Sequence, residues 1–87
     1  MRLALVYREH SEYARWVETF VNDYRKRTGN EIELIDPDSI RGEGFCRAYD
    51  VMSYPTLLAI QPDGSCYQRW QEHNWPLLEA VATIASI

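Results

Sequence analysis

Few residues of this sequence have the types and spacing that catalytic or metal chemistry requires. The two cysteines, Cys46 and Cys66, stand 20 positions apart and form no Cys-x-x-Cys pair. The two histidines, His10 and His73, are distant from each other, and together with the unclustered carboxylates of the chain they do not make a metal site. We therefore predict no metal site, no bound cofactor and no catalytic residue.

His10 and Ser11 are adjacent, which raises the question of an activated hydroxyl. A serine nucleophile needs a base within hydrogen-bond reach and a third group that orients the base, and no such group is identifiable here. We interpret Ser11 as the cap of a following helix and His10 as a surface loop residue. Both cysteines are interpreted as small buried apolar side chains rather than reactive thiols.

Phosphate chemistry is not indicated either. Gly42 and Gly44 lack the further glycine and the lysine of a phosphate-binding loop. The basic run at residues 25–27 falls where a helix should end, and there it complements the helix dipole. The acidic residues between positions 36 and 50 are interpreted as a solvated edge.

The composition is that of one small folded domain spanning residues 1–87. Hydrophobic residues make up 46% of the chain and aromatic residues 13%, which is enough for a packed core. The net charge of −4 argues against a nucleic-acid partner. No apolar run approaches the ~20 residues of a membrane span, and the first residues show no signal-peptide pattern. We therefore expect no membrane association and a cytoplasmic location, in which the cysteines stay reduced.

Hydrophobic periodicity predicts the elements of the first half. Residues 2–7 form an apolar run that predicts a buried strand. A helix is predicted from Ser11 to Gly29, where the glycine ends it. Residues 31–36 alternate and predict a second strand. The apolar faces of these elements carry Tyr13, Trp16, Val17, Phe20, Val21, Tyr24, Ile32 and Leu34.

The second half is predicted to hold two helices and a hairpin. A short helix opens at Asp38 or Ser39, and Gly42 and Gly44 interrupt it early. Residues 56–61 and 65–71 predict two strands joined by a tight Pro-Asp-Gly turn. A last helix is capped by Asn74 or Trp75 and has Pro76 in its first turn. The apolar faces of the two helices carry Phe45, Ala48, Tyr49 and Met52, and then Leu77, Leu78, Val81 and Ile84.

The predicted order is therefore β-α-β-α-β-β-α. The first two strands should be parallel with a right-handed crossover, and the last two antiparallel. This describes an α/β fold with a four-stranded mixed sheet and helices on both of its faces.

Residues 49–64, YDVMSYPTLLAIQPDG, resemble the stretch of thioredoxins that enters the third core strand. Together with the element order, this makes the whole chain similar to the thioredoxin-like superfamily. The resemblance implies a cis peptide bond between Tyr54 and Pro55.

Thioredoxins and glutaredoxins carry Cys-x-x-Cys between the first core strand and the first helix. The helix N-terminus there lowers the pKa of the attacking thiol, and the second cysteine resolves the mixed disulfide. The corresponding stretch, residues 8–13, reads Arg-Glu-His-Ser-Glu-Tyr and contains no cysteine. Dithiol–disulfide exchange at this place is therefore excluded, and single-cysteine glutathione chemistry lacks its nucleophile.

The leading hypothesis is a binding module for a protein or peptide. The resemblance implies that the backbone before the cis-proline pairs with an extended peptide. The alternative interpretation of Tyr54 is half-buried packing. The predicted binding surface comprises His10, Ser11, Tyr13, Tyr54 and Pro55.

Two other classes of function stay open. The N-terminal half of glutathione transferases has the same element order, and it would use Tyr7 or Ser11 to activate the thiol of glutathione. That family's helical second domain and its Glu-Ser pair are missing, since residues 71–73 read Gln-Glu-His. The third class is a structural subunit whose oligomeric state the sequence leaves open. Its apolar contacts would come from Trp70, Trp75, Ile84 and Ile87, for which core packing is the other interpretation.

Overall fold

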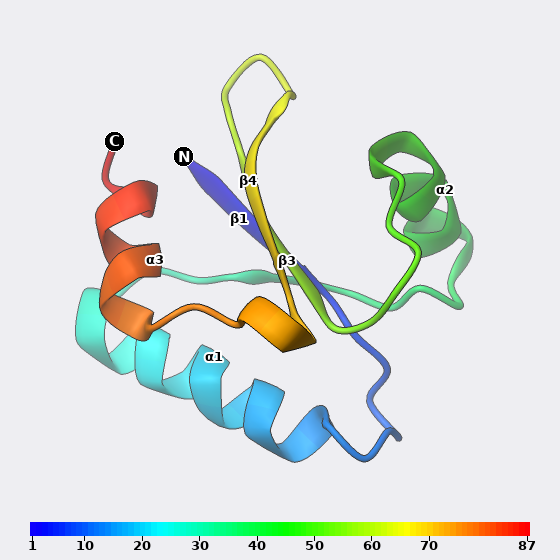
Figure 1. Ribbon diagram of the computed structural model, residues 1–87, viewed down its shortest axis with the longest axis horizontal. Coiled ribbons are helices and arrows are strands. Elements are labelled where there is room, and N and C mark those ends of the chain that lie inside the picture. Colours follow the sequence, from blue (N-terminus) through cyan, green and yellow to red (C-terminus); the bar gives the residue numbers. More distant parts are fainter.

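The computed structural model describes residues 1–87, and its elements follow the predicted order (Figure 1). The strands are β1 (Arg2–Val6), β2 (Glu33–Ile35), β3 (Thr56–Ile60) and β4 (Cys66–Gln71). The helices are α1 (Ala14–Thr28), α2 (Ile40–Tyr49) and α3 (Leu78–Ala85), with a 3-10 turn η1 (Glu72–Asn74) after β4. No helix is both long and apolar enough to cross a membrane.

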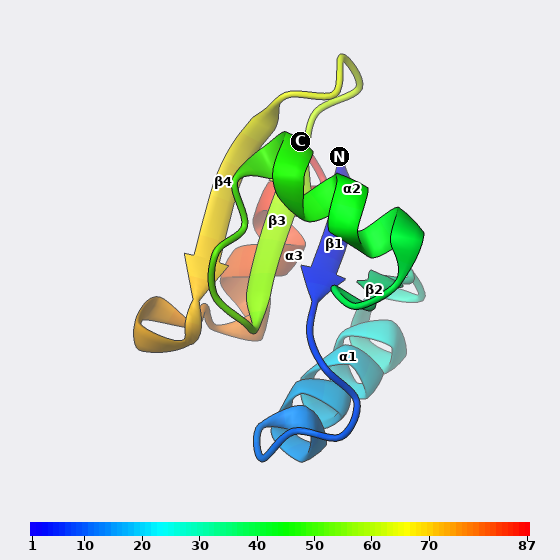
Figure 2. The same ribbon diagram turned by 90° about the vertical axis from the view of Figure 1, so that its right-hand side faces the viewer.

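The four strands form one mixed sheet in the order β2-β1-β3-β4. β1 runs parallel to β2 and antiparallel to β3, and β3 and β4 form the antiparallel hairpin. α1 and α3 cover one face of the sheet and α2 covers the other, as Figures 1 and 2 show. The predicted four-stranded mixed sheet with helices on both faces is confirmed.

Two hydrophobic cores lie on the two faces of the sheet. Because side chains alternate along a strand, β1 and β3 each supply both cores. Leu3 and Leu5 pack with α1 and α3, while Ala4 and Val6 pack with α2. Every residue of β3 is buried. The two central strands are therefore enclosed on both sides, and polar side chains are confined to their ends.

Helix α1 ends as predicted but begins later. Gly29 has a left-handed backbone (φ 76°), and its N–H donates to the Arg25 carbonyl at 2.8 Å. The predicted cap at Ser11 is wrong, because the helix begins at Ala14. The Ser11 hydroxyl instead donates to the Arg8 carbonyl at 2.6 Å, which ties a turn before the helix.

Strand β2 is shorter than predicted and lies at the edge of the sheet. Ile32 is buried, but Leu34 is 45% exposed because no strand and little of α1 covers it. Ile35 packs into the α2 core. The carboxylate of Glu33 accepts two hydrogen bonds from Arg2 and also pairs with Arg41, so one side chain links β1, β2 and α2.

Helix α2 begins as predicted at Ser39, whose Oγ accepts from the Gly42 N–H at 2.9 Å. The predicted interruption at Gly42 and Gly44 is wrong, because the helix runs through both residues. Gly42 is buried, and a Cβ at this position would lie 1.7 Å from the Asp36 carbonyl oxygen. The glycine therefore lets the helix lie directly against the loop that follows β2.

The predicted inner face of α2 is only partly right. Phe45 and Tyr49 are half-buried, with ring centroids 4.7 Å apart. Ala48 is exposed, and Met52 is 86% exposed. The helix stops at Asp50, whose left-handed backbone (φ 53°) breaks the periodicity before Met52. The side chain that faces the sheet is instead Cys46, four residues after the buried Gly42.

The last helix also begins later than predicted. Asn74 accepts a hydrogen bond from the Gln71 N–H at 2.7 Å and so belongs to η1, and Pro76 lies in the link before α3. Leu77, expected on the apolar face, is 79% exposed because it precedes the helix. Val81 is fully buried, and Leu78 and Ile84 pack against the core.

The tryptophans of the C-terminal region pack within the chain. Trp70 is buried on β4. Trp75 meets Trp16 and Phe20 of α1 edge to face, at centroid distances of 5.0 and 5.5 Å. These contacts attach the segment before α3 to α1. Trp70 and Trp75 therefore follow the core-packing interpretation.

Substitution of the two α2 glycines by alanine should have opposite effects. Gly42→Ala forces the helix away from the Asp36 carbonyl, and we expect it to lower the free energy of unfolding by about 2–3 kcal/mol. Gly44→Ala meets no atom within 4 Å and should raise it by about 0.5–1 kcal/mol through helix propensity. Urea unfolding followed by circular dichroism measures both. Equal effects of the two substitutions would contradict the close approach at Gly42.

Candidate functional site

Four loops meet at one edge of the sheet, namely the edge formed by the ends of the strands and not by an outer strand. β1 and β2 are parallel, so both end at this edge, and β3 begins there because it is antiparallel to β1. Thr56 pairs with Gln71, so β4 also ends there and continues into η1. The loop before β3, the β1–α1 loop and the β2–α2 loop lie together at this end (Figure 2). The sheet thus brings together segments that are far apart in the sequence.

Arg8 joins three of these segments. Its Nε and Nη2 donate to the two carboxylate oxygens of Asp38 at 3.0 and 3.2 Å. Its guanidinium carbon lies 4.9 Å from the centroid of the Tyr54 ring, a cation–π contact. Its backbone N–H donates to the Tyr13 hydroxyl at 3.1 Å. The hydrogen bonds that Arg8 donates to Asp38 raise the pKa of Arg8, so this side chain stays charged.

Sequence reasoning missed Arg8 and Asp38 as members of the site. Each of them follows closely on one of two predicted parallel strands, and such strand ends lie at the same edge of a sheet. The opposite charges at these two positions were therefore the sequence signal that could have placed Arg8 and Asp38 at the site. The bidentate contact is partly exposed, so it positions the loops more than it stabilises the fold.

The loop before β3 presents Tyr54 and Pro55 to the edge. The peptide bond between them is cis, and Pro55 is buried while Tyr54 is half-buried. The Thr56 hydroxyl donates to the Ser53 carbonyl at 2.7 Å and holds the loop. The Tyr54 phenol lies beside the thiol of Cys46, and burial together with this neighbour raises the pKa of Tyr54.

The main chain of Tyr54 has no partner inside the molecule. The backbone and side-chain hydrogen bonds of the chain include none to its N–H or its C=O. Backbone polar groups that no internal partner satisfies must bond to water or to a ligand. This residue therefore offers one donor and one acceptor at the edge where the loops meet.

Two hollows lie where these loops meet, and the loop before β3 lines the first of them. A hollow of about 440 Å³ is lined by Ser53, Tyr54, Pro55, Gln71, Glu72 and His73. A second hollow of about 270 Å³ is lined by Arg8, Glu9, His10, Ser11, Asp36 and Asp38. We call them the η1 hollow and the β1–α1 hollow.

The five residues predicted to bind a partner thus divide between the two hollows. Tyr54 and Pro55 line the first, and His10 and Ser11 line the second. Tyr13 lines neither hollow, but its hydroxyl bonds to the backbone of Arg8. His73, which was not among the predicted binding residues, lies in the η1 hollow because the hairpin register carries η1 to the Tyr54 loop.

The fold is similar to that of solved structures. Thioredoxin 1 from the thermophilic eubacterium Thermosipho africanus superposes with a TM-score of 0.72 over 99% of this chain and 92% of that chain, at 17% identity. The chain has a thioredoxin-like fold. A structure described as a malarial protein superposes with a TM-score of 0.68 over 97% of this chain and 91% of that chain, at 15% identity. No family model matches the sequence, and no curated protein matches it.

The thiols of this thioredoxin-like chain lie away from the β1–α1 loop. Cys46 is buried in the α2 core and Cys66 is half-buried on β4, and both are free. Burial raises the pKa of the Cys46 thiol. A raised pKa leaves little thiolate, which is the form that attacks disulfides.

Tyr7 does not lie at the site either. It lines a separate hollow between α1 and β2, and its hydroxyl donates to the Glu18 carboxylate at 2.9 Å. Burial and the hydrogen bond to Glu18 raise the pKa of Tyr7 to about 12. A tyrosine that activates a thiol is suited to that role by an accessible hydroxyl of lowered pKa, and Tyr7 has the opposite environment.

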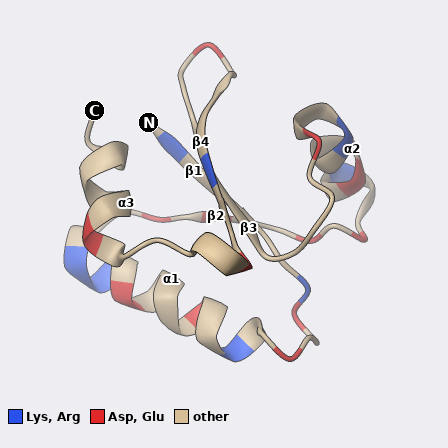
Figure 3. Ribbon diagram, viewed as in Figure 1, with Lys and Arg blue, Asp and Glu red and all other residues tan.

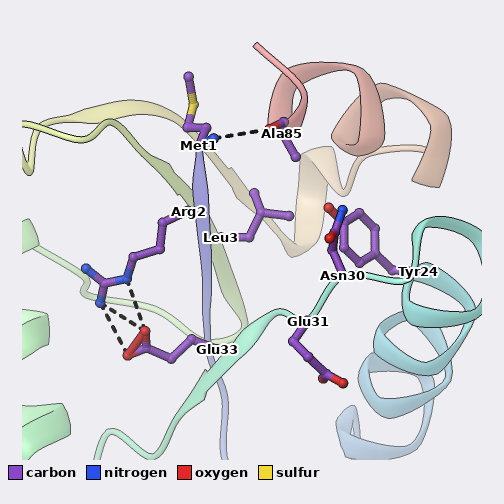
Figure 4. A pocket seen from close by; sticks show the side chains of 8 residues that line it. All are labelled: Met1, Arg2, Leu3, Tyr24, Asn30, Glu31, Glu33 and Ala85. Atoms are coloured by element: carbon purple, nitrogen blue, oxygen red, sulfur yellow. Dashed lines mark hydrogen bonds and ion pairs between the residues drawn. The ribbon is translucent and has the colours of Figure 1, made fainter.

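The largest hollow of the molecule, about 550 Å³, lies at the opposite end of the sheet (Figure 4). The hollow lies at the start of β1, where the Met1 amine donates a hydrogen bond to the Ala85 carbonyl at 3.1 Å. Glu33 borders it, and the hydrogen bonds from Arg2 lower the pKa of its carboxyl. The hollow contains none of the residues predicted to bind a partner.

Tyr7→Phe should change how stability depends on alkaline pH. Because the pKa of Tyr7 is raised on folding, its contribution is complete below its ordinary value of about 10 and is lost as the pH rises towards 12. We expect the wild-type free energy of unfolding to fall more steeply between pH 10 and 12 than that of Tyr7→Phe. Urea unfolding at several pH values measures this. Tyr67→Phe, at an exposed position on β4, is the matched control and should keep the wild-type slope.

Proposed function

We propose that this chain is a protein- or peptide-binding module with no dithiol chemistry of its own. One observation carries the proposal: the N–H and C=O of Tyr54 lack internal partners at an edge flanked by two hollows. An extended segment laid along residues 53–55 would supply an acceptor and a donor to this one residue, which is recognition by strand addition.

The local chemistry limits how such a segment pairs. Pro55 has no N–H, so the pairing stops at Tyr54 and cannot slide along the loop. Side chains of an extended segment point alternately to opposite sides. Neighbouring side chains of the bound segment would then enter the η1 hollow and the β1–α1 hollow. Main-chain bonds supply affinity, and the hollows supply selectivity.

The charges and thiols at the site support binding more than catalysis. Arg8 and Asp38 neutralise each other, so neither is free to act as a general acid or base. The Ser11 hydroxyl donates a hydrogen bond to the Arg8 carbonyl. The Cys46 thiol lies behind Tyr54 with a raised pKa. These groups shape a surface and hold it in place.

A glutathione-binding enzyme remains a separate hypothesis without a supporting observation. Its proposed thiol activators do not fit, because Tyr7 bonds to Glu18 in another hollow and Ser11 bonds to a backbone carbonyl. Glutathione also carries two carboxylates, and the two hollows contain Glu9, Asp36 and Glu72. Like charges at these positions would oppose its binding.

Peptide binding should depend on Tyr54. Peptides selected against the chain from a random display library should, on titration into isotope-labelled protein, shift the amide signals of residues 53 and 54 most strongly. Tyr54→Ala removes the ring that lines the η1 hollow, and we expect an affinity about tenfold lower. Tyr67→Ala, another partly exposed tyrosine, should keep the wild-type affinity. Shifts gathered instead around Met1 and Ala85 would contradict the proposal.

The chain should not catalyse insulin reduction by dithiothreitol. The loop that faces Pro55 in this fold has no thiol, and burial raises the pKa of Cys46. We expect the turbidity of insulin to develop at the background rate with wild-type protein. A rate above background that disappears in Cys46→Ser would contradict the redox-inactive part of the proposal.

A further inference from the structure

We propose that the partner is a basic extended segment, which places lysine or arginine side chains in the η1 hollow and the β1–α1 hollow. This inference rests on the proposed strand pairing at Tyr54 and adds the chemical class of what is bound.

The first support is the charge of the two hollows. The β1–α1 hollow contains Glu9, Asp36 and Asp38 against the single cation Arg8, which is already paired with Asp38. The η1 hollow contains Glu72 and no lysine or arginine. Glu9, Asp36 and Glu72 take part in none of the ion pairs of the chain, which involve other carboxylates. Each hollow therefore keeps at least one carboxylate without a cationic partner.

The distribution of charge over the molecule points the same way. Most basic side chains lie elsewhere: at the C-terminal end of α1, on α2, and within β1 and β4 (Figure 3). Those of α2 and the last turn of α1 are largely engaged, as in the pairs of Arg41 with Glu33, Arg47 with Glu43 and Arg27 with Glu79. The net charge of −4 would also steer a cationic segment towards the chain.

The second support is the shape of the surface around Tyr54. The half-buried Tyr54 ring lines the η1 hollow, which contains Glu72, and it contacts Arg8, which lines the β1–α1 hollow together with Glu9. Lysine and arginine have long apolar stems and charged ends, so their stems can cover the exposed part of the Tyr54 ring while the ends reach Glu72 or Glu9. An acidic segment would instead set carboxylate against carboxylate in both hollows.

The test uses three unstructured peptides of equal length in which pairs of lysine, glutamine or glutamate residues alternate with pairs of threonine, so that neighbouring side chains on opposite sides of the segment can carry the same group. Each is titrated into isotope-labelled protein, and amide shifts report the site and the affinity. We expect the lysine peptide to shift residues 53 and 54 with an affinity at least about tenfold above that of the glutamine peptide. The glutamate peptide should cause no shifts at these residues.

Two variants and a matched control locate the charge effect. Glu9→Gln and Glu72→Gln each remove one exposed carboxylate that has no internal partner, and each should weaken the lysine peptide about threefold. Glu31→Gln makes the same change of net charge at the opposite end of the sheet, where Glu31 borders the largest hollow. It should leave the affinity almost unchanged at about 0.15 M salt, where exposed charges more than about 8 Å apart are largely screened.

The outcomes separate the two proposals. Equal binding of the glutamine and lysine peptides at Tyr54 would overturn the basic partner and leave strand pairing standing. An equal loss of affinity in Glu31→Gln and Glu72→Gln would also overturn the basic partner, since the attraction would then depend on the net charge of the chain and not on the hollows. Failure of every peptide to shift residues 53 and 54 would overturn both the basic partner and the strand pairing at Tyr54.

Discussion

The enclosure of β1 and β3 on both faces is the constraint on which the rest of this structure depends. Leu3 and Leu5 need the cover of α1 and α3, and Ala4 and Val6 need the cover of α2. Because both faces of β1 and β3 are covered, the ionisable and hydrogen-bonding side chains of these two strands can lie only at the strand ends. At the end where β1 and β2 stop and β3 begins, those groups converge into one edge, and the candidate site is the consequence.

The α2 layer connects this core to the site. Gly42 lets the helix touch the loop at Asp36, and one turn later Cys46 enters the core beside the Tyr54 phenol. On the solvent side of the same ring lies Arg8, held by Asp38 from the loop that α2 contacts. Tyr54 is thus fixed from both sides by groups whose positions follow from the packing of α2. The unpaired main chain of Tyr54 is presented by a supported loop, which lowers the entropy lost on binding.

The sequence was sufficient for element order, sheet type and the loop at Tyr54, because these follow from periodicity and from one recognisable segment. It failed where local geometry overrides periodicity. Ser11 looked like a cap, but its hydroxyl bonds backwards to Arg8. Met52 continued the apolar spacing of α2 in the sequence, but the left-handed Asp50 had already ended the helix. His73 was missed because its place depends on the register of a hairpin that contains an irregularity between Ala59 and Ile60.

The Tyr54 main chain and the β1–α1 loop belong to separate parts of this fold, so the side chains of one can change without the other. The main-chain donor and acceptor of Tyr54 belong to the loop before β3, whereas the exposed β1–α1 loop is the stretch that corresponds to the Cys-x-x-Cys position of the resemblance. Replacing thiols in an exposed loop removes little packing, so the loop is free to carry other side chains. Here it carries Arg8, Glu9 and His10, which border a hollow instead of supplying a nucleophile. The proposed backbone pairing of Tyr54 would be indifferent to the partner's sequence, so selectivity would come from the carboxylates of the two hollows.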